Sequence, residues 1–322
     1  MTLVVNKDIF LLNVENKQRF VNLLGQELRD AGYEVHHAEG DADRLIIEVA
    51  LLCNELGPTA IAADDTDILC MALDASINPF HDLFIAAQRK QKKGTRKVWD
   101  VKQVQEKLPL ISKHILFLHT FLGCDTTSRV HGIGKAAPLS TYSTNIKLQE
   151  CANIFLQPNA QKEDIIQAGE KAFLLLYKSK KAKTLNTLRH HMFAQRVSTK
   201  MAQVDPAKLP PTSSAAKFHS LRVYLQICMM KSSACSLNPE DWGWLQENNV
   251  FYPIVTDQSP APDSLLQLIK CGCKGNCATR ACTCVSNGMK CSIACENCKG
   301  SACTNATIID VDPIEADEDL DE

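Results

Sequence analysis

Nine of the fifteen cysteines in this 322-residue chain fall within 33 residues near the C-terminus. Their spacing is C-x-C-x3-C-x4-C-x-C-x6-C-x3-C-x2-C-x4-C. They are Cys271, Cys273, Cys277, Cys282, Cys284, Cys291, Cys295, Cys298 and Cys303. Zinc binds four such thiolates tetrahedrally, so three zinc ions need twelve ligand positions, which nine cysteines supply when three of them bridge two ions each. The segment therefore predicts a three-zinc cluster with no cysteine left over.

The charge around these cysteines favours metal binding. One acid, Glu296, stands among five bases, Lys270, Lys274, Arg280, Lys290 and Lys299. Basic neighbours stabilise the thiolate that metal binding requires. The competing interpretation is a disulfide-linked secreted domain, which favours an even cysteine count. The odd count, and an N-terminus at 1–10 without signal-peptide features, favour zinc in a reducing compartment. The isolated cysteines are expected to be buried thiols: Cys53, Cys70, Cys124, Cys151, Cys228 and Cys235.

The cysteine pattern resembles the tesmin-type CXC domain over about residues 265–305. Members of that family bind three zinc ions and insert into DNA, with an aromatic residue just before the fourth cysteine making the groove contact. The resemblance implies that the nine cysteines are zinc ligands and that DNA is the partner. Here Ala281 occupies the aromatic position, and the last two spacings, x2 and x4, differ from the usual x and x2. Lys274, Arg280 and Lys290 are therefore the expected substitutes for the DNA contact.

Strand-like and helix-like segments alternate along the N-terminal half. Apolar periodicity predicts helices at 17–31, 41–56 and from 65, and strands at 33–38, 59–63 and 82–87. This order predicts an α/β fold in which a parallel sheet carries helices on both faces. Helices are expected again around 171–177 and 216–230, the second with Phe218, Leu221 and Leu225 on one stripe.

Aspartates follow the predicted strands. Asp41 and Asp43 come after the first strand, Asp65 and Asp67 come after the second, and Asp125 lies in a later loop. Because ligands bind beyond the carboxyl ends of parallel strands, these acids are expected to converge. Each one alone can simply cap the helix that follows it. Together they predict a site for magnesium or manganese that supports phosphodiester hydrolysis.

Three motifs resemble the flap endonuclease and PIN-like nuclease superfamily over about residues 17–140. They are EGDADRLI at 39–46, AADDTDIL at 62–69 and LGCDTTSRVHGIGKAAPL at 122–139. The resemblance implies that the five aspartates are catalytic metal ligands and that the last motif is a helix-hairpin-helix. Active members carry a further acid on the first strand, whereas only Asp8 and Glu15 precede the first expected helix here. Either the chain is a fragment of a longer gene product or the site lost a ligand, so we expect a nuclease-like domain that is inactive or incomplete in this chain.

Two further features point to nucleic acid. Gly132 and Gly134 permit a tight turn whose N–H groups, with Lys135, can face a phosphate. Six bases around Gly94 can neutralise phosphates at a hairpin tip or loop: Arg89, Lys90, Lys92, Lys93, Arg96 and Lys97. A merely solvated loop or a nuclear import signal would use the same six residues.

The sequence thus predicts four parts: a nuclease-like domain at 1–145, a helical extension and linker at 146–260, the zinc module at 265–305 and an acidic disordered tail at 306–322. The tail would be solubilising or would bind a protein partner. No apolar run reaches the roughly 18 residues of a membrane span. The architecture resembles a family of transposon-derived proteins. The favoured hypothesis is a nuclear DNA-binding protein; an active magnesium-dependent nuclease and a protein-interaction module are the alternatives.

Overall fold

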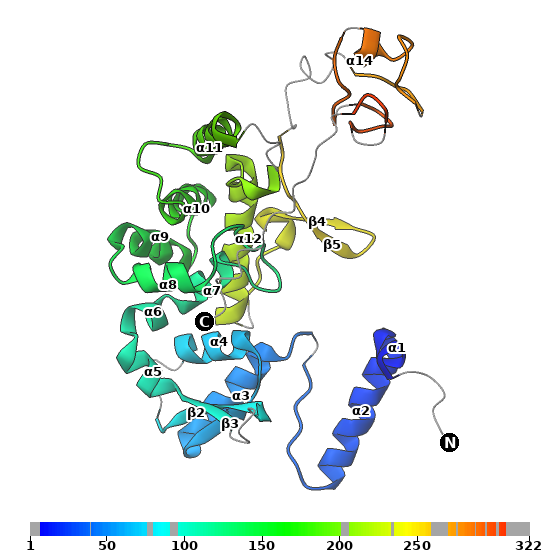
Figure 1. Ribbon diagram of the computed structural model, residues 1–322. Coiled ribbons are helices and arrows are strands. Elements are labelled where there is room, and N and C mark those ends of the chain that lie inside the picture. Colours follow the sequence, from blue (N-terminus) through cyan, green and yellow to red (C-terminus); the bar gives the residue numbers. More distant parts are fainter. Residues whose placement is uncertain are drawn as a thin grey trace. The chain divides into compact units, whose positions relative to one another are not determined.

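The computed structural model describes residues 7–38, 40–75, 80–90, 96–200, 206–232, 235–258 and 270–306, the last range without 275, 287, 294, 301 and 302. The chain divides into two compact units, which are shown in Figure 1 and described separately below. The first unit comprises Met1–Lys113 and Met230–Ala234, and the second comprises His114–Met229 and Cys235–Glu322.

The first unit combines helices with a small sheet. Its elements are α1 (Lys7–Leu12), α2 (Val14–Asp30), α3 (Asp43–Leu56), β1 (Thr59–Ala62), α4 (Thr66–Ala75), β2 (Leu83–Lys90), β3 (Arg96–Asp100), α5 (Val101–Lys107) and α6 (Pro109–Lys113). Strand β2 lies in the middle, parallel to β1 and antiparallel to β3. Ile61, Leu83 and Ile85 are buried, as are Ile47 of α3 and Ile68 of α4. The core of this unit therefore forms between the sheet and these two helices.

The mixed α/β class and two of the three predicted strands are confirmed, but the large parallel sheet is not. The segment 33–38 forms no strand. Tyr33 is exposed, and His36 Nε2 lies 2.7 Å from Glu34 Oε1, so its polar side chains contact each other instead of a neighbouring strand. Within the described residues, only β1 and β2 are parallel, because the chain returns from β2 through a hairpin into β3.

Helix α2 confirms the helix predicted at 17–31, including its end at Gly32. Gly32 has φ +87°, and Tyr33 N–H donates to Leu28 O at 3.0 Å. Glycine reaches this left-handed conformation without the Cβ penalty, so it terminates the helix. The apolar stripe does not behave as expected, because Phe20, Leu23 and Leu28 remain exposed.

The second unit is helical apart from one hairpin. Its elements are α7 (Ile115–Phe121), α8 (Ala136–Tyr142), α9 (Ile146–Leu156), α10 (Lys162–Leu176), α11 (Leu185–Lys200), η1 (Pro206–Lys208), α12 (Ser213–Lys231, whose last two residues belong to the first unit), η2 (Pro239–Trp242), β4 (Trp244–Glu247), β5 (Val250–Pro253) and α14 (Thr283–Ser286). Helices α9, α10 and α11 follow one another beside α12 (Figure 1).

Helix α12 supplies much of this core, as the stripe at 216–230 predicts. Phe218, Leu221 and Leu225 are buried, and so are most of the residues between them. A helix that is buried on nearly all sides must lie inside its unit. Trp242 stacks on Tyr224 with ring centroids 4.8 Å apart and is buried, which gives this tryptophan a structural role.

The isolated cysteines are only partly as expected. Cys70 and Cys151 are buried, whereas Cys53 is exposed and Cys124, Cys228 and Cys235 are half-buried. Cys53 lies near the C-terminal end of α3, next to exposed Leu52, which is on the outer side of the helix. An apolar sequence neighbourhood therefore did not guarantee burial.

Candidate zinc centre and acidic site

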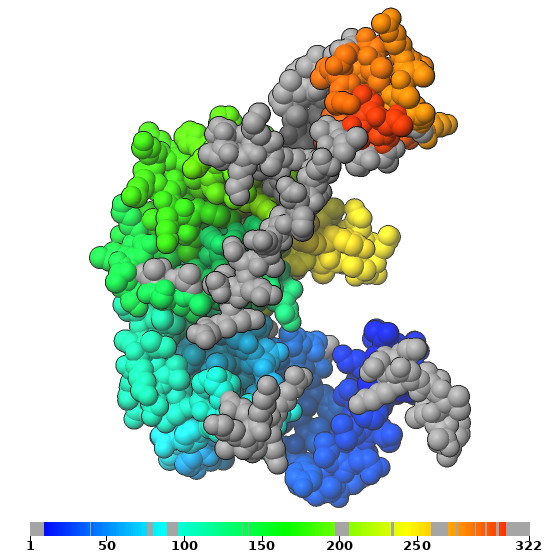
Figure 2. All heavy atoms as spheres, viewed as in Figure 1, coloured from blue at the N-terminus to red at the C-terminus, as the bar shows by residue number. Residues whose placement is uncertain are grey.

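The nine C-terminal cysteines come together in one small body. The described residues of 270–306 are coloured orange to red in Figure 2 and pack against one another. Seven of the sulfur-bearing side chains are buried against one another, and Cys273 and Cys303 are partly buried beside them. All nine are free thiols. The sequence prediction that these residues form a single cluster is thus confirmed.

The sulfur separations have the size that a metal site requires. The Sγ–Sγ distances are 3.8 Å for Cys271–Cys277, 3.9 Å for Cys271–Cys291 and Cys282–Cys291, and 3.5 Å for Cys284–Cys295. Four thiolates about 2.3 Å from one zinc ion lie about 3.8 Å apart, whereas a disulfide joins its sulfurs at about 2.05 Å. The cluster can therefore hold zinc, and its geometry is not that of disulfides.

The thiols also share partners in the way that bridging ligands do. Three groups of four sulfurs lie within 4.8 Å of one another: Cys271, Cys273, Cys277 and Cys282; Cys271, Cys277, Cys291 and Cys298; Cys271, Cys282, Cys284 and Cys291. Cys271 belongs to all three groups, and Cys277, Cys282 and Cys291 each belong to two. Thiolates placed between neighbouring groups are suited to contact more than one ion.

Backbone hydrogen bonds hold the cysteine-bearing turns together. Glu296 N–H donates to Cys271 O at 3.0 Å, and Cys291 N–H donates to Asn305 O at 3.1 Å. Gly300 has φ +72°, and a Cβ there would lie 2.8 Å from the Ser292 carbonyl carbon, so a larger residue does not fit. The buried cluster consists of cysteine, with Val285 partly buried against it. Cysteine-rich cores of this size commonly draw folding energy from a bound metal.

The protein environment ionises some of these thiols more readily than others. The Val285 backbone N–H, with the Cys271 thiol and the Cys284 N–H, lowers the pKa of Cys282 to about 6 against the effect of burial. Burial instead raises the pKa values of Cys284 and Cys291. Because zinc binds thiolates, zinc binding must release the thiol protons of the cysteines whose pKa is raised, such as Cys284 and Cys291.

Three of the five predicted catalytic aspartates lie together in the first unit. Carboxylate oxygens of Asp43, Asp65 and Asp67 lie within 4.8 Å of one another. Asp43 is the first residue of α3, Asp65 lies between β1 and α4, and Asp67 is the second residue of α4. Asp41 is exposed and lies outside this group, and Asp125 is exposed in the second unit. The prediction that acids following successive strands converge is therefore met by three of the five side chains, although no strand precedes Asp43.

The D-x-D spacing has a local structural use as well. Asp43 N–H donates to Asp41 Oδ1 at 3.2 Å, and Asp67 N–H donates to Asp65 Oδ1 at 2.9 Å. In each pair the first acid satisfies a backbone donor at the start of a helix, as a capping side chain does. Asp65 both caps α4 and contributes to the acidic group, whereas Asp41 precedes Ala42, the N-cap residue of α3, and its carboxylate only accepts from the backbone two residues on.

The predicted nucleic-acid contacts are spread over several segments. Lys274, Arg280 and Lys290 are all exposed on the zinc module. Arg96 and Lys97 are exposed at the start of β3, next to the predicted hairpin tip, and Lys97 Nζ lies 4.6 Å from the Trp99 ring centroid. Arg89 and Lys90 end β2, although their side chains, like Lys92 and Lys93, lie outside the described residues.

The helix-hairpin-helix motif folds as a helix, a loop and a second helix. The loop joins α7 to α8, and Ile133 N–H donates to Val130 O at 3.2 Å across a turn that contains Gly132 at φ +73°. Gly134 does not adopt a positive φ. Lys135 Nζ lies 3.5 Å from His119 Nδ1. The predicted tight turn is present, and Gly132 is the glycine that it requires.

No protein-family model, no curated protein and no solved structure matches this chain. The site is therefore interpreted from its own residues. In the part of the chain that the structure describes, no helix has the length and apolar character needed to cross a membrane.

Proposed function

We propose that this chain is a zinc-dependent DNA-binding protein of the nucleus, and that its nuclease-like region no longer catalyses hydrolysis. The observation that carries the proposal is the gathering of nine free thiols, among which four pairs of sulfurs lie 3.5–3.9 Å apart, near the edge length of a zinc-thiolate tetrahedron. We infer three zinc ions, because nine thiolates satisfy three tetrahedral ions when three thiolates bridge.

The charges of the module support DNA as its partner. Lys274, Arg280 and Lys290 are exposed, whereas Lys270 Nζ lies 3.6 Å from Glu296 Oε1 and is partly neutralised. Exposed cations near a duplex neutralise phosphates and release counterions, which gives affinity without sequence readout. Ala281 offers no aromatic side chain for a groove contact, so phosphate contacts carry this interaction.

The proposal predicts DNA binding that weakens steeply with salt. Replacing Arg280 and Lys290 by Gln removes two phosphate contacts, so the slope of log affinity against log salt should become shallower by about 2. Fluorescence anisotropy with a labelled duplex, at several salt concentrations and with the zinc-loaded chain, measures this slope. The matched control replaces Lys102 and Lys147, which are exposed in helices outside the module, and should leave the slope unchanged.

Two results would count against DNA as the partner. The first is an unchanged slope in the Arg280 and Lys290 variant while the control variant binds normally. The second is the absence of duplex binding at low salt by a chain that carries its full zinc content. The second result would favour a zinc-stabilised module that binds other proteins, for which the acidic tail at 306–322 is a further candidate surface.

A working magnesium-dependent nuclease is the second candidate, and the grouping of Asp43, Asp65 and Asp67 supports it. Magnesium prefers carboxylate oxygens and keeps several waters, which suits exposed or half-buried acids. Against catalysis, residues 7–38 form helices and irregular chain instead of a strand that carries a further acid. We expect the loss of that ligand to weaken metal binding at the site.

Cleavage assays separate the two candidates. Branched and single-stranded substrates are incubated with the protein and magnesium or manganese, and our proposal expects no cleavage above background. Cleavage that disappears in Asp65→Asn but persists in Asp64→Asn would establish the nuclease. The control suits this purpose because Asp64 Oδ1 accepts from Gln88 N–H at 2.9 Å, an acceptor that asparagine retains.

A further inference from the structure

A cavity of about 440 Å³ opens in the second unit, and its lining includes neither the cysteines nor the acidic group. Its walls come from the loop at 128–131, from α10, α11 and α12, from the segment at 206–212 and from the end of β5 with the residues after it. Ligand sites in proteins commonly occupy about 300–1,000 Å³. The cavity therefore has the size of a site for a small molecule or for one nucleotide.

The cavity is lined by cations and by no acid. Arg129, Arg189 and Arg222 lie in its wall, together with His131 and His219, and none of the described lining residues is Asp or Glu. Arg129 and His131 are exposed, whereas Arg222 is buried. Such a lining attracts an anion.

Arg222 gives the strongest indication of a ligand. Arg222 is only 5% exposed. Its guanidinium donates to Gly243 O at 3.0 Å and to Ile254 O at 2.7 Å. Among the described residues, no carboxylate lies within ion-pair distance of it, and burial lowers its pKa. A buried charge without a counter-ion is unfavourable, and an anion in the cavity would relieve this.

Arg189 is held in place by the same kind of contact. Its guanidinium donates to Pro210 O at 2.6 Å and to Pro206 O at 3.1 Å. A guanidinium has five N–H donors, so the two carbonyls fix the group and leave donors for an anion. The positive charge of the cavity thus comes from arginine. Burial lowers the pKa of His219 to about 4, and this neutral ring lies 3.1 Å from Phe121 O through Nε2.

The remaining walls are apolar and fixed. Phe173, Leu209, Pro211 and Val255 line the cavity, as does Tyr177, whose hydroxyl donates to His131 O at 3.1 Å. An apolar wall favours a ligand with a flat hydrophobic body over a bare inorganic anion.

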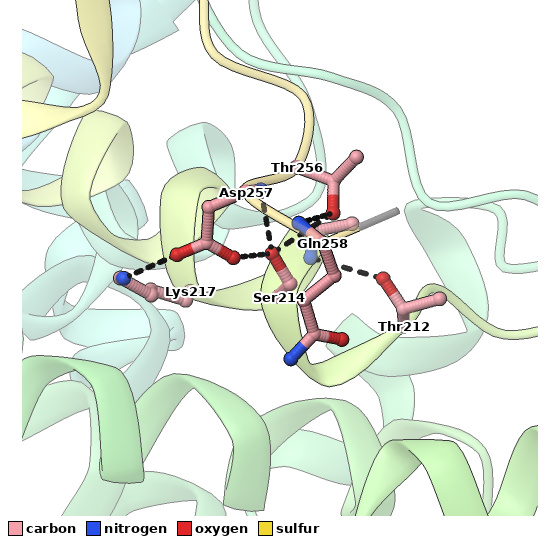
Figure 3. Close-up of polar contacts among 7 residues, drawn as sticks. Thr212, Ser214, Lys217, Thr256, Asp257 and Gln258 are labelled. Carbon is pink, nitrogen blue, oxygen red and sulfur yellow. Dashed lines mark hydrogen bonds and ion pairs between the residues drawn. The ribbon is translucent and has the colours of Figure 1, made fainter. Parts of the chain in front are cut away.

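A polar network at the start of α12 holds one wall (Figure 3). Ser214 Oγ donates to Asp257 Oδ1 at 2.5 Å, and Lys217 Nζ lies 2.8 Å from Asp257 Oδ2. Thr256, which lines the cavity, donates from its hydroxyl to Ser214 Oγ at 3.0 Å. Asp257 is thereby occupied by Ser214 and Lys217 and is not a lining residue, so the wall is rigid without adding a negative charge to the cavity.

Arg222 is buried and, although its guanidinium carbon lies 5.8 Å from the Trp244 ring centroid, it has no carboxylate partner among the described residues. From this residue and the arginine-lined apolar cavity, we propose a binding site for a nucleoside monophosphate, either free or as the phosphorylated terminal nucleotide of a strand. The phosphate would meet the guanidinium groups, and the base would pack on the apolar wall. This site is additional to DNA binding through the zinc module and does not depend on it.

Isothermal titration of the full, zinc-loaded chain tests the proposal with dAMP, deoxyadenosine and inorganic phosphate. We expect saturable binding of dAMP. Deoxyadenosine should bind more weakly by about tenfold or more, because it lacks the phosphate that forms the charge-assisted hydrogen bonds. Inorganic phosphate should also bind more weakly than dAMP. Arg129→Gln and Arg189→Gln should each lower the affinity for dAMP by about tenfold. Arg129 is exposed, so its replacement leaves the fold intact.

Arg196→Gln is the matched control, because Arg196 also lies on α11 and donates to a carbonyl, Lys208 O at 2.9 Å, but does not line the cavity. A 5′-phosphorylated oligonucleotide distinguishes a free nucleotide from the terminal nucleotide of a strand as the ligand. If the oligonucleotide binds more tightly than dAMP, the site takes strand ends; if it binds more weakly, the site takes a free nucleotide. Replacing Arg280 and Lys290 should not change dAMP binding, which separates this site from the proposed DNA contact. No dAMP binding at millimolar concentration, or equal affinity in the two cavity variants and the control, would refute the proposal.

Discussion

The natively purified chain is expected to carry three zinc ions, and stripping them with a chelator should unfold residues 270–306 while leaving the helical units folded. The reason is that this segment buries cysteine sulfurs and hardly any hydrocarbon. Structural zinc sites contribute about 10–16 kcal/mol of apparent binding energy near neutral pH, which a core of this kind cannot replace. Native mass spectrometry measures the zinc count, and hydrogen exchange shows which residues lose protection.

Single cysteine variants should not be equivalent. Cys271 belongs to all three four-sulfur groups, so Cys271→Ser should release more than one zinc ion. Cys273 is half-buried and belongs to one group, so Cys273→Ser should release at most one. Cys235→Ser is the control, since this cysteine lies outside the cluster and should leave the zinc count unchanged. A full count in Cys271→Ser, or covalently paired thiols in the native chain, would contradict the bridged cluster.

The cysteine cluster could be predicted from the sequence because its information is local. All nine ligands lie in one segment, and thiolate chemistry together with tetrahedral arithmetic fixes how many partners they need. Their predicted clustering did not depend on any long-range contact. The helices at 17–31 and 216–230 were predictable for the same reason, because their periodicity is written within one stretch of chain.

The sheet was harder to predict because strand pairing is decided by distant residues. The segment 33–38 alternates like a strand, yet it contains Glu34 and His36, which contact each other, and it has no partner strand among the described residues. The pairing direction of β3 likewise follows from the hairpin after β2, which the sequence suggested only as a tip or loop. Local alternation could not distinguish a paired strand from an extended connection.

The arginine-lined cavity had no motif to predict it. Its cations come from a loop, from α11 and from α12, and they meet only after the chain has folded. One sequence signal was available: Arg222 interrupts an apolar stretch that otherwise reads as a core helix, AKFHSLRVYLQICMM. A cation within a core helix requires either an acid or a ligand nearby. The acidic group was predicted better, since Asp65 and Asp67 lie within five residues of the end of β1.

Gly169→Ala is expected to destabilise the second unit by about 3 kcal/mol through overpacking. Gly169 is buried on α10, where it faces α12, and a Cβ at this position would lie 2.7 Å from Ser220 Cβ and closer still to its hydroxyl. Ser220 is itself buried, and its hydroxyl donates to Ala216 O at 2.7 Å, so it cannot swing away freely. Hydrogen exchange of the amides in α10 and α12 measures the change in this unit alone.

The second change that tests this contact is Ser220→Gly, which removes the obstructing side chain. The nearest remaining atom to the added Cβ would be Phe155 Cζ at 3.5 Å, an ordinary van der Waals contact. In that background Gly169→Ala should become neutral or stabilising by up to about 1 kcal/mol, because alanine favours the helix. A sign reversal of this kind would locate the effect in the α10–α12 contact; an undiminished loss in the double variant would show that it arises elsewhere. Because Phe173 lines the cavity and lies about one turn after Gly169 on α10, Gly169→Ala should weaken dAMP binding in parallel with stability, and Ser220→Gly should restore both.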